Sequence, residues 1–259
     1  MVHSAQSLTP IRTLLAYPHT VYAVLSAGFF ACVSTLLILP FGLLRRGERE
    51  QWASPVARAF GWLCIHLVLF ARPEVFGANN LPSRRGYLVV CNHRSWLDVL
   101  LLVWATDSIG ISKREIGWIP FLGLGGKIAG AIFFDRRDRN ARAHVVTEAL
   151  SMMSRNANIH VFPEGTRTRN GALAERVHLR LIIEAWNHNI PVVPACVWDT
   201  EKTLPSGRWL VFGGRKAGLE IATPPNPRDF PDGATYAHAV WDCVRALAKQ
   251  HGADQEWAA

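Results

Sequence analysis

Short apolar runs alternate with longer helix-like runs along most of this chain. The apolar runs predict strands near residues 87–91, 131–135, 159–162, 191–198, 209–212 and 218–222. The helix-like runs predict helices near residues 97–106, 141–155, 174–188 and 234–250. Alternation of this kind indicates layers of helix packed against a sheet. We therefore expect one α/β domain over residues 73–259, a mixed sheet with helices on both faces.

The N-terminal part differs in character. Thr20 to Leu44 is a run of 25 residues without a formal charge. As a helix of about 20–44 it would measure about 37 Å, against about 30 Å for the hydrocarbon core of a bilayer. A second apolar run, Phe60 to Ala71, is too short to cross alone and predicts an interfacial helix of about 57–71. Residues 1–72 are therefore expected to attach the domain to a membrane.

The charge distribution indicates orientation and partners. Arg12 is the only Lys or Arg before the long apolar run. A cluster of arginines follows the run: Arg45, Arg46 and Arg49. The positive-inside tendency then predicts a cytoplasmic main domain. The net charge of +8 favours anionic lipid headgroups and acidic substrates. Nucleic acid is not expected, because the arginines are dispersed and no binding motif is present. The five separated cysteines and scattered histidines predict neither disulfides nor a metal site.

A candidate base and its orienting carboxylate follow the strand that begins at Tyr87. The run YLVVCNHRSWLD places His93 at the strand's end and Asp98 five residues later. Five residues on a straight helix turn through about 500°, so the two side chains cannot meet there. They can meet if His93 lies in the turn and Asp98 in the first turn of the next helix. The alternative is that Asp98 completes a capping box with Ser95, and spacing alone leaves both readings open.

Arginines stand beyond two other predicted strands. In IHVFPEGTR, Pro163 ends the strand and Arg167 follows, and in GAIFFDR the strand ends at Arg136. Guanidinium groups bind phosphate bidentately, which predicts an anion site. If the strands run alike, His93, Arg136 and Arg167 converge at one edge of the sheet, where such folds place ligands.

Four blocks in order, NHRSWLD, GAIFFDR, FPEGTR and IPVVPACV, resemble the glycerolipid acyltransferase family, most closely its bacterial 1-acyl-sn-glycerol-3-phosphate acyltransferase branch. The resemblance spans about Gly86 to Val197. It implies an acyltransferase domain with His93 and Asp98 as the catalytic pair. It also implies a substrate contact for Lys113, within ISKREIGWIPFLG, and a set of phosphate-binding residues, Arg136, Glu164, Gly165, Thr166 and Arg167.

The resemblance implies transfer of a fatty acyl group from acyl-CoA or acyl carrier protein to the free hydroxyl of 1-acylglycerol 3-phosphate, giving phosphatidic acid at the cytoplasmic face of a bacterial inner membrane. The thioester is a co-substrate, and no cofactor is expected. Direct transfer is expected, because a thiol leaves readily while an alcohol needs a base; an acyl-enzyme on Cys91 is the competing mechanism. The family commonly carries a Phe-Lys-Lys-Gly-like patch where this chain reads ERVHLRL, Glu175 to Leu181. Other acceptors (glycerol 3-phosphate, a lysophospholipid or a lyso-aminolipid) and a catalytically silent lipid-binding role therefore stay open.

Overall fold

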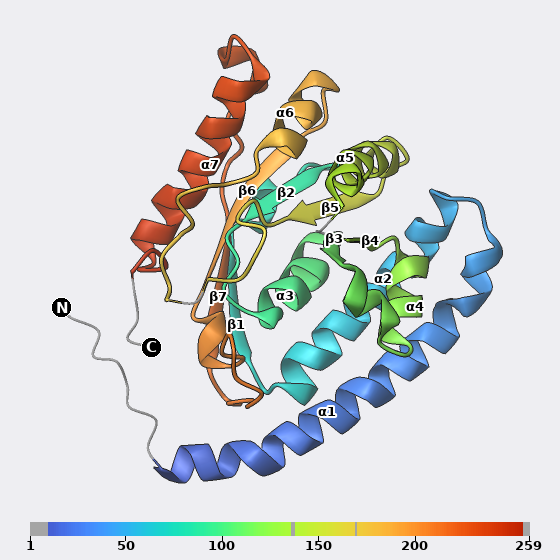
Figure 1. Cartoon of the computed structure of the whole chain (residues 1–259), viewed down its shortest axis with the longest axis vertical. Helices are drawn as coiled ribbons and strands as arrows, with labels where there is room; N and C mark the ends of the chain where they lie inside the picture. The colour runs from blue at the N-terminus through green and yellow to red at the C-terminus, as the bar shows by residue number, and fades with distance from the viewer. Residues whose placement is uncertain (1–9, 136–137, 169, 256–259) are drawn as a thin grey trace.

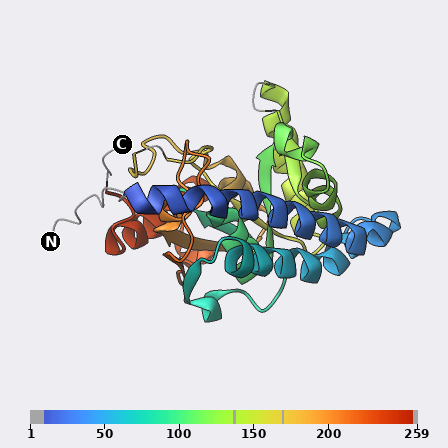
Figure 2. The same cartoon turned by 90° about the horizontal axis from the view of Figure 1, so that it is seen from below.

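Two helices precede the sheet in the computed structural model, which describes residues 10–135, 138–168 and 170–255. Helix α1 spans Pro10–Ile38 and α2 spans Glu48–Leu63, with a 3₁₀ turn, Leu39–Leu43, between them. A π-helical turn, Cys64–Val68, continues α2. The two helices pack side by side, as Figures 1 and 2 show from perpendicular directions.

The observed helix bounds correct the expected 20–44 and 57–71. Helix α1 ends at Ile38 because Pro40 lacks an N–H and disfavours helical geometry in the residue before it. Helix α2 begins nine residues early, at Glu48, where the Glu50 carboxylate accepts a hydrogen bond from the Gly47 backbone N–H. Acidic residues at a helix start are favourable, so charge rather than apolar character sets this boundary.

One stretch of helix, Thr13–Leu43, is long and apolar enough to cross a membrane within the part of the chain that the structure describes. Only 17% of its most apolar window is buried, so its side chains are not those of a core helix. Large apolar side chains such as Leu25 and Phe29 are exposed along it. Its length, composition and exposure suggest membrane attachment by this helix.

The sheet has seven strands in the order β1-β7-β6-β2-β5-β3-β4. Neighbours run parallel except β6 and β7, which are antiparallel, so the sheet is mixed as the sequence predicts. The strand bounds are β1 Arg72–Phe76, β2 Leu88–Cys91, β3 Ser108–Lys113, β4 Ile132–Phe134, β5 Asn158–Val161, β6 Val192–Trp198 and β7 Lys216–Ile221.

Helices cover both faces of the sheet (Figure 1). In strand β2, Val89 and Cys91 face a core shared with α3 and the segment after α2, whereas Leu88 and Val90 face α5, α6 and α7. All four β2 side chains are fully buried, which is typical of a central parallel strand. The helix bounds are α3 Trp96–Thr106, α4 Leu122–Ala129, α5 Arg139–Met153, α6 Arg180–Asn187 and α7 Gly233–Gln250.

Two element predictions are wrong. Residues 209–212 form no strand, because the backbone N–H groups of Val211 and Phe212 donate to the Thr20 hydroxyl (2.9 Å) and the Thr203 carbonyl (2.9 Å) instead of a neighbouring strand. Helix α6 begins at Arg180 rather than near residue 174. The preceding segment forms neither helix nor strand, and a hydrogen bond from the His178 N–H to the Pro163 carbonyl, 2.8 Å, ties it to the loop after β5.

Candidate active site

The turn after β2 is fixed to its neighbouring strand by Asn92. The Asn92 side chain donates to the Val197 carbonyl (3.0 Å) and accepts from the Val197 N–H (2.8 Å). A buried amide that makes both bonds extends the pairing of β2 and β6 by one residue. The next residue, His93, therefore starts from a rigid position at the end of the sheet.

His93 and Asp98 meet as the turn geometry predicts. His93 Nδ1 lies 2.8 Å from Asp98 Oδ2, with His93 in the turn and Asp98 in the first turn of α3. The Asp98 side chain is 0% exposed, and that of His93 is 14% exposed. With Nδ1–H donating to the carboxylate, Nε2 carries the lone pair that can accept a proton. This arrangement can act as a general base whose imidazolium the carboxylate stabilises.

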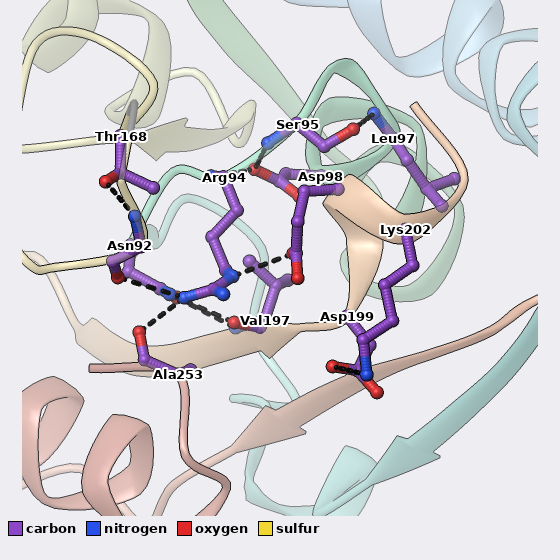
Figure 3. Close-up of polar contacts among 12 residues, drawn as sticks. Asn92, Arg94, Ser95, Leu97, Asp98, Thr168, Val197, Asp199, Lys202 and Ala253 are labelled. Carbon is purple, nitrogen blue, oxygen red and sulfur yellow. Dashed lines mark hydrogen bonds and ion pairs between the residues drawn. The ribbon is translucent and has the colours of Figure 1, made fainter. Parts of the chain in front are cut away.

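Asp98 also completes a capping box with Ser95, as the alternative interpretation predicts. Its Oδ2 accepts hydrogen bonds from the backbone N–H groups of Arg94 (2.6 Å) and Ser95 (2.7 Å), while the Ser95 hydroxyl accepts from Leu97 N–H (3.2 Å). Figure 3 shows this cluster at the start of α3. The two readings are therefore compatible, because a single carboxylate oxygen caps the helix and holds the imidazole.

Phe162 packs against the other side of the imidazole. Its ring stacks on that of His93 with centroids 3.9 Å apart and an interplanar angle of 11°. Phe162 follows β5, which pairs with β2 in the register Val90↔Val161, so the two rings come from neighbouring strand ends. Phe162 is not among the predicted site residues, and the signal for it in the sequence is an aromatic residue immediately before Pro163. Stacking and the bond to Asp98 together restrict the imidazole to one orientation.

Glu164 connects the loop after β5 to the catalytic turn. Its Oε1 accepts from His93 N–H (2.8 Å) and its Oε2 from Ala174 N–H (3.2 Å). Burial raises the pKa of Glu164 to about 7, against the lowering effect of these two hydrogen bonds. Both oxygens face backbone donors, which gives Glu164 a positioning role. The phosphate contact implied for it stays a prediction, and a carboxylate is a poor neighbour for phosphate.

Glu164→Gln is expected to change how stability depends on pH. Because the folded-state pKa of about 7 lies above the ordinary 4.5, the proton stabilises the fold fully below about pH 4.5, and this contribution is lost as pH rises through 7. Relative to Glu164→Gln, the wild type should therefore lose about 2–3 kcal/mol of unfolding free energy between pH 4.5 and 8. Denaturant titrations in one detergent measure this, with exposed Glu175→Gln as control. Parallel wild-type and Glu164→Gln curves would contradict the assignment.

The Gly-Thr-Arg stretch lies beside the same turn. Gly165 adopts a left-handed φ of 68°, and the Thr168 N–H donates to the His93 carbonyl at 2.9 Å. Thr166 is exposed. The Arg167 guanidinium lies over the Trp96 ring, 4.9 Å from its centroid, and burial lowers its pKa. This brings Arg167 to the edge of the catalytic turn, within a partly dry environment that strengthens its pull on an anion.

Two other expected substrate contacts remain predictions. Lys113 ends β3 and is exposed, and Arg136 lies outside the described residues. The structure therefore places Arg167 beside the His93–Asp98 pair, whereas the expected convergence of Arg136 stays a prediction. Among the described residues no group of three or more His, Cys, Asp or Glu side chains could hold a metal ion.

A cavity of about 420 Å³ opens between the N-terminal helices and the sheet. It is lined mainly by apolar side chains of α1, α2, α3 and α4, with β3 and β4 beneath. Trp96 and Phe162 belong to its lining, and these are the residues that contact Arg167 and His93. An apolar cavity of this size suits a lipid chain, and its wall reaches the candidate base.

Comparisons with known proteins agree with this geometry. The family model described as Acyltransferase matches residues 72–198. The 1-acyl-sn-glycerol-3-phosphate acyltransferase alpha of Ovis aries is 35% identical over 146 residues, 53% of this chain and 51% of that protein. The 1-acyl-sn-glycerol-3-phosphate acyltransferase of Saccharomyces cerevisiae is 28% identical over 212 residues, 79% of this chain and 67% of that protein. The chain thus spans about half the length of the first of these relatives.

A solved structure matches nearly the whole fold. The crystal structure of the 1-acyl-sn-glycerophosphate (LPA) acyltransferase PlsC from Thermotoga maritima superposes with a TM-score of 0.77 at 25% identity, covering 96% of this chain and 100% of that one. The match includes the N-terminal helices, which lie outside the residues that the family model matches. On this sequence and structural similarity, residues 72–198 of the chain belong to the acyltransferase family.

Proposed function

We propose that this protein is a membrane-attached 1-acylglycerol-3-phosphate O-acyltransferase, which moves a fatty acyl group from acyl-CoA or acyl carrier protein to the free hydroxyl of lysophosphatidic acid. The observation that carries the proposal is the His93–Asp98 contact of 2.8 Å at the wall of an apolar cavity, with Arg167 alongside. The names of the relatives support the same acceptor.

In the proposed reaction, His93 Nε2 takes the proton of the acceptor hydroxyl as its oxygen attacks the thioester carbonyl. The carbon–sulfur bond breaks, the thiolate leaves, and it takes up the proton that His93 received. Asp98 stabilises the imidazolium between these steps. Arg167 binds the acceptor phosphate, with Arg136 as a second expected contact, so that the hydroxyl is held in line with the carbonyl.

Direct transfer is favoured over an acyl-enzyme. Cys91 is fully buried in β2, and burial raises the pKa of its thiol well above the ordinary value. The reactive form of cysteine is the thiolate, so this residue is a poor nucleophile. The Ser95 hydroxyl is occupied as well, because it donates to the Leu204 carbonyl at 2.8 Å and caps α3.

The N-terminal part contributes to the site and not only to attachment. We assign residues 1–72 to membrane attachment and 73–259 to the acyltransferase domain, with the main domain on the cytoplasmic side of a bacterial inner membrane. Helices α1 and α2 supply one wall of the cavity. An acyl chain can therefore pass from the bilayer into the cavity without crossing water, which avoids about 0.8 kcal/mol for each exposed CH₂ group.

The ERVHLRL segment, Glu175 to Leu181, lies beside the expected phosphate-binding loop. The His178 N–H of this segment donates to the Pro163 carbonyl at 2.8 Å, and the His178 ring lies so near Gly165 that a Cβ there would be 3.3 Å from it. Purified protein in detergent with labelled acyl-CoA should transfer the label to lysophosphatidic acid in preference to glycerol 3-phosphate, a lysophospholipid or a lyso-aminolipid. Preference for another acceptor would correct the substrate. Lipid binding without transfer to any acceptor, from CoA or carrier protein, would leave the silent lipid-binding role.

Arg167→Gln is expected to lower kcat/KM for lysophosphatidic acid by about 10- to 100-fold, because a charged hydrogen bond to phosphate contributes about 1.5–3 kcal/mol. Transfer to monoacylglycerol, which lacks the phosphate, should change little between wild type and variant. The control is Arg245→Gln, which removes an exposed arginine from α7. Equal losses with both acceptors would contradict a phosphate contact and indicate a role in holding Trp96.

A further inference from the structure

Arg94 follows His93 directly, and its side chain is buried in the protein. It is 4% exposed. Its Nε donates to Glu201 Oε2 at 2.9 Å, and its Nη1 donates to the carbonyls of Gly171 (3.2 Å) and Ala253. Figure 3 shows Arg94 extending from the start of α3 to Ala253. One buried guanidinium thus contacts the loop after the Glu-Gly-Thr-Arg stretch, the 3₁₀ helix Thr200–Lys202 and the segment that follows α7.

The segment after α7 is held in place by contacts of its own. His251 stacks on Trp198 with centroids 3.6 Å apart and an interplanar angle of 1°, and its Nε2 lies 2.6 Å from Glu220 Oε2. The Ala253 N–H donates to the Ala248 carbonyl at 2.6 Å. The Ala253 carbonyl is therefore presented to Arg94 by a segment anchored to β6, β7 and α7.

The same residue reaches the catalytic pair through its backbone. The Arg94 N–H donates at 2.6 Å to Asp98 Oδ2, the oxygen that holds the His93 ring. A displacement of Arg94 therefore moves a donor of the catalytic carboxylate. A planar guanidinium fixes several donor directions at once, which a lysine ammonium does not.

We propose that Arg94 is a positioning residue that couples the His93–Asp98 turn to the C-terminal segment 251–253, which makes that segment part of the catalytic framework. Glu201 and Ala253 both lie beyond residues 72–198, which the family model matches, so the coupling joins that region to the part of the chain that follows it. The inference rests on the proposed acyl transfer for its kinetic consequence, but not for the coupling itself.

The test compares Arg94→Lys, Arg94→Gln, Glu201→Gln and a chain ending at Gln250 with two controls, Arg245→Gln and a chain ending at Gln255. Steady-state transfer should show kcat reduced about 10- to 100-fold in Arg94→Gln with KM for both substrates unchanged, since a displacement of about 1 Å can cost about 10²-fold. Arg94→Lys should recover little of this loss, whereas added guanidinium should recover part of it in Arg94→Gln. The controls should match the wild type.

Hydrogen exchange provides a readout that needs no substrate. Exchange in peptides covering residues 92–98 should rise in Arg94→Gln and in the chain ending at Gln250, but not in the chain ending at Gln255. Normal exchange and normal kcat in the folded chain ending at Gln250 would overturn the coupling, even if Arg94→Gln fails to fold. Absence of transfer by the wild type would count against the proposed function alone, because exchange still decides the coupling.

Discussion

His93→Ala is expected to lower kcat by about 10²–10⁴-fold, the usual contribution of a positioned general base. His93 Nδ1 lies 2.8 Å from Asp98 Oδ2, so Nε2 is the ring nitrogen that can accept a proton. Binding of lysophosphatidic acid should persist, because the expected phosphate contact at Arg167 is intact. Radiolabelled acyl transfer in detergent, with acceptor binding measured in parallel, checks both statements.

The fold should tolerate this substitution. His93 is 14% exposed at its side chain, and its main apolar contact is the stack on Phe162. Loss of one such stack costs about 0.5–1.5 kcal/mol. His188→Ala is a suitable control, because that ring lies on the surface and bonds only locally to the Glu184 carbonyl. Wild-type turnover by His93→Ala would exclude His93 as the base and require another group to take the proton of the acceptor hydroxyl.

The turn that brings His93 and Asp98 together was predictable from the sequence because its geometry is local. Spacing excluded a straight helix for His93 and Asp98 and left a turn followed by a helix start, which is what the structure contains. The central strands were predictable for a related reason, since β2 and β6 are buried on both faces and read as continuous apolar runs.

Strands β1 and β3 were missed because tertiary contacts, not composition, make them strands. Strand β3 reads SIGISK, with small residues on the face where Gly110 pairs with His160. A Cβ at Gly110 would lie 2.4 Å from His160 Nε2. The glycine therefore leaves room for a side chain that is 50 residues away in the chain. Strand β1 is an edge strand with alternating exposure, paired only with β7. Neither strand can be predicted without knowing the strand that it pairs with.

The surroundings of the site were unpredictable for the same reason. Nothing in NHRSWLD indicates that Arg94 is buried, because two of its acceptors, Glu201 and Ala253, lie more than 100 residues further along the chain. The contact between Phe162 and His93 depends on the register of β5 against β2. Local patterns therefore identify the candidate reacting groups, whereas the order of the strands in the sheet decides which residues support them.

Asp98→Asn is expected to lower both activity and stability, which separates it from His93→Ala. Asp98 Oδ2 accepts from His93 Nδ1 and from the backbone N–H groups of Arg94 and Ser95, and the side chain is 0% exposed. An asparagine oxygen can take the same place, but a neutral amide gives weaker bonds and adds a buried NH₂ group. The free energy of unfolding should fall by about 1–3 kcal/mol. Without the carboxylate charge the imidazolium is less stable, so kcat should fall about 10²-fold or more.

The stability and the kcat of Asp98→Asn together distinguish a capping role from a catalytic role, because the two roles predict different combinations of these two quantities. If Asp98 only caps α3, Asp98→Asn should unfold at lower denaturant concentration while its folded fraction keeps wild-type kcat. If it also orients His93, kcat falls even at temperatures where the variant is fully folded. The double variant with His93→Ala should then be no slower than His93→Ala alone, since a carboxylate that acts only through the imidazole has nothing left to support once the imidazole is removed.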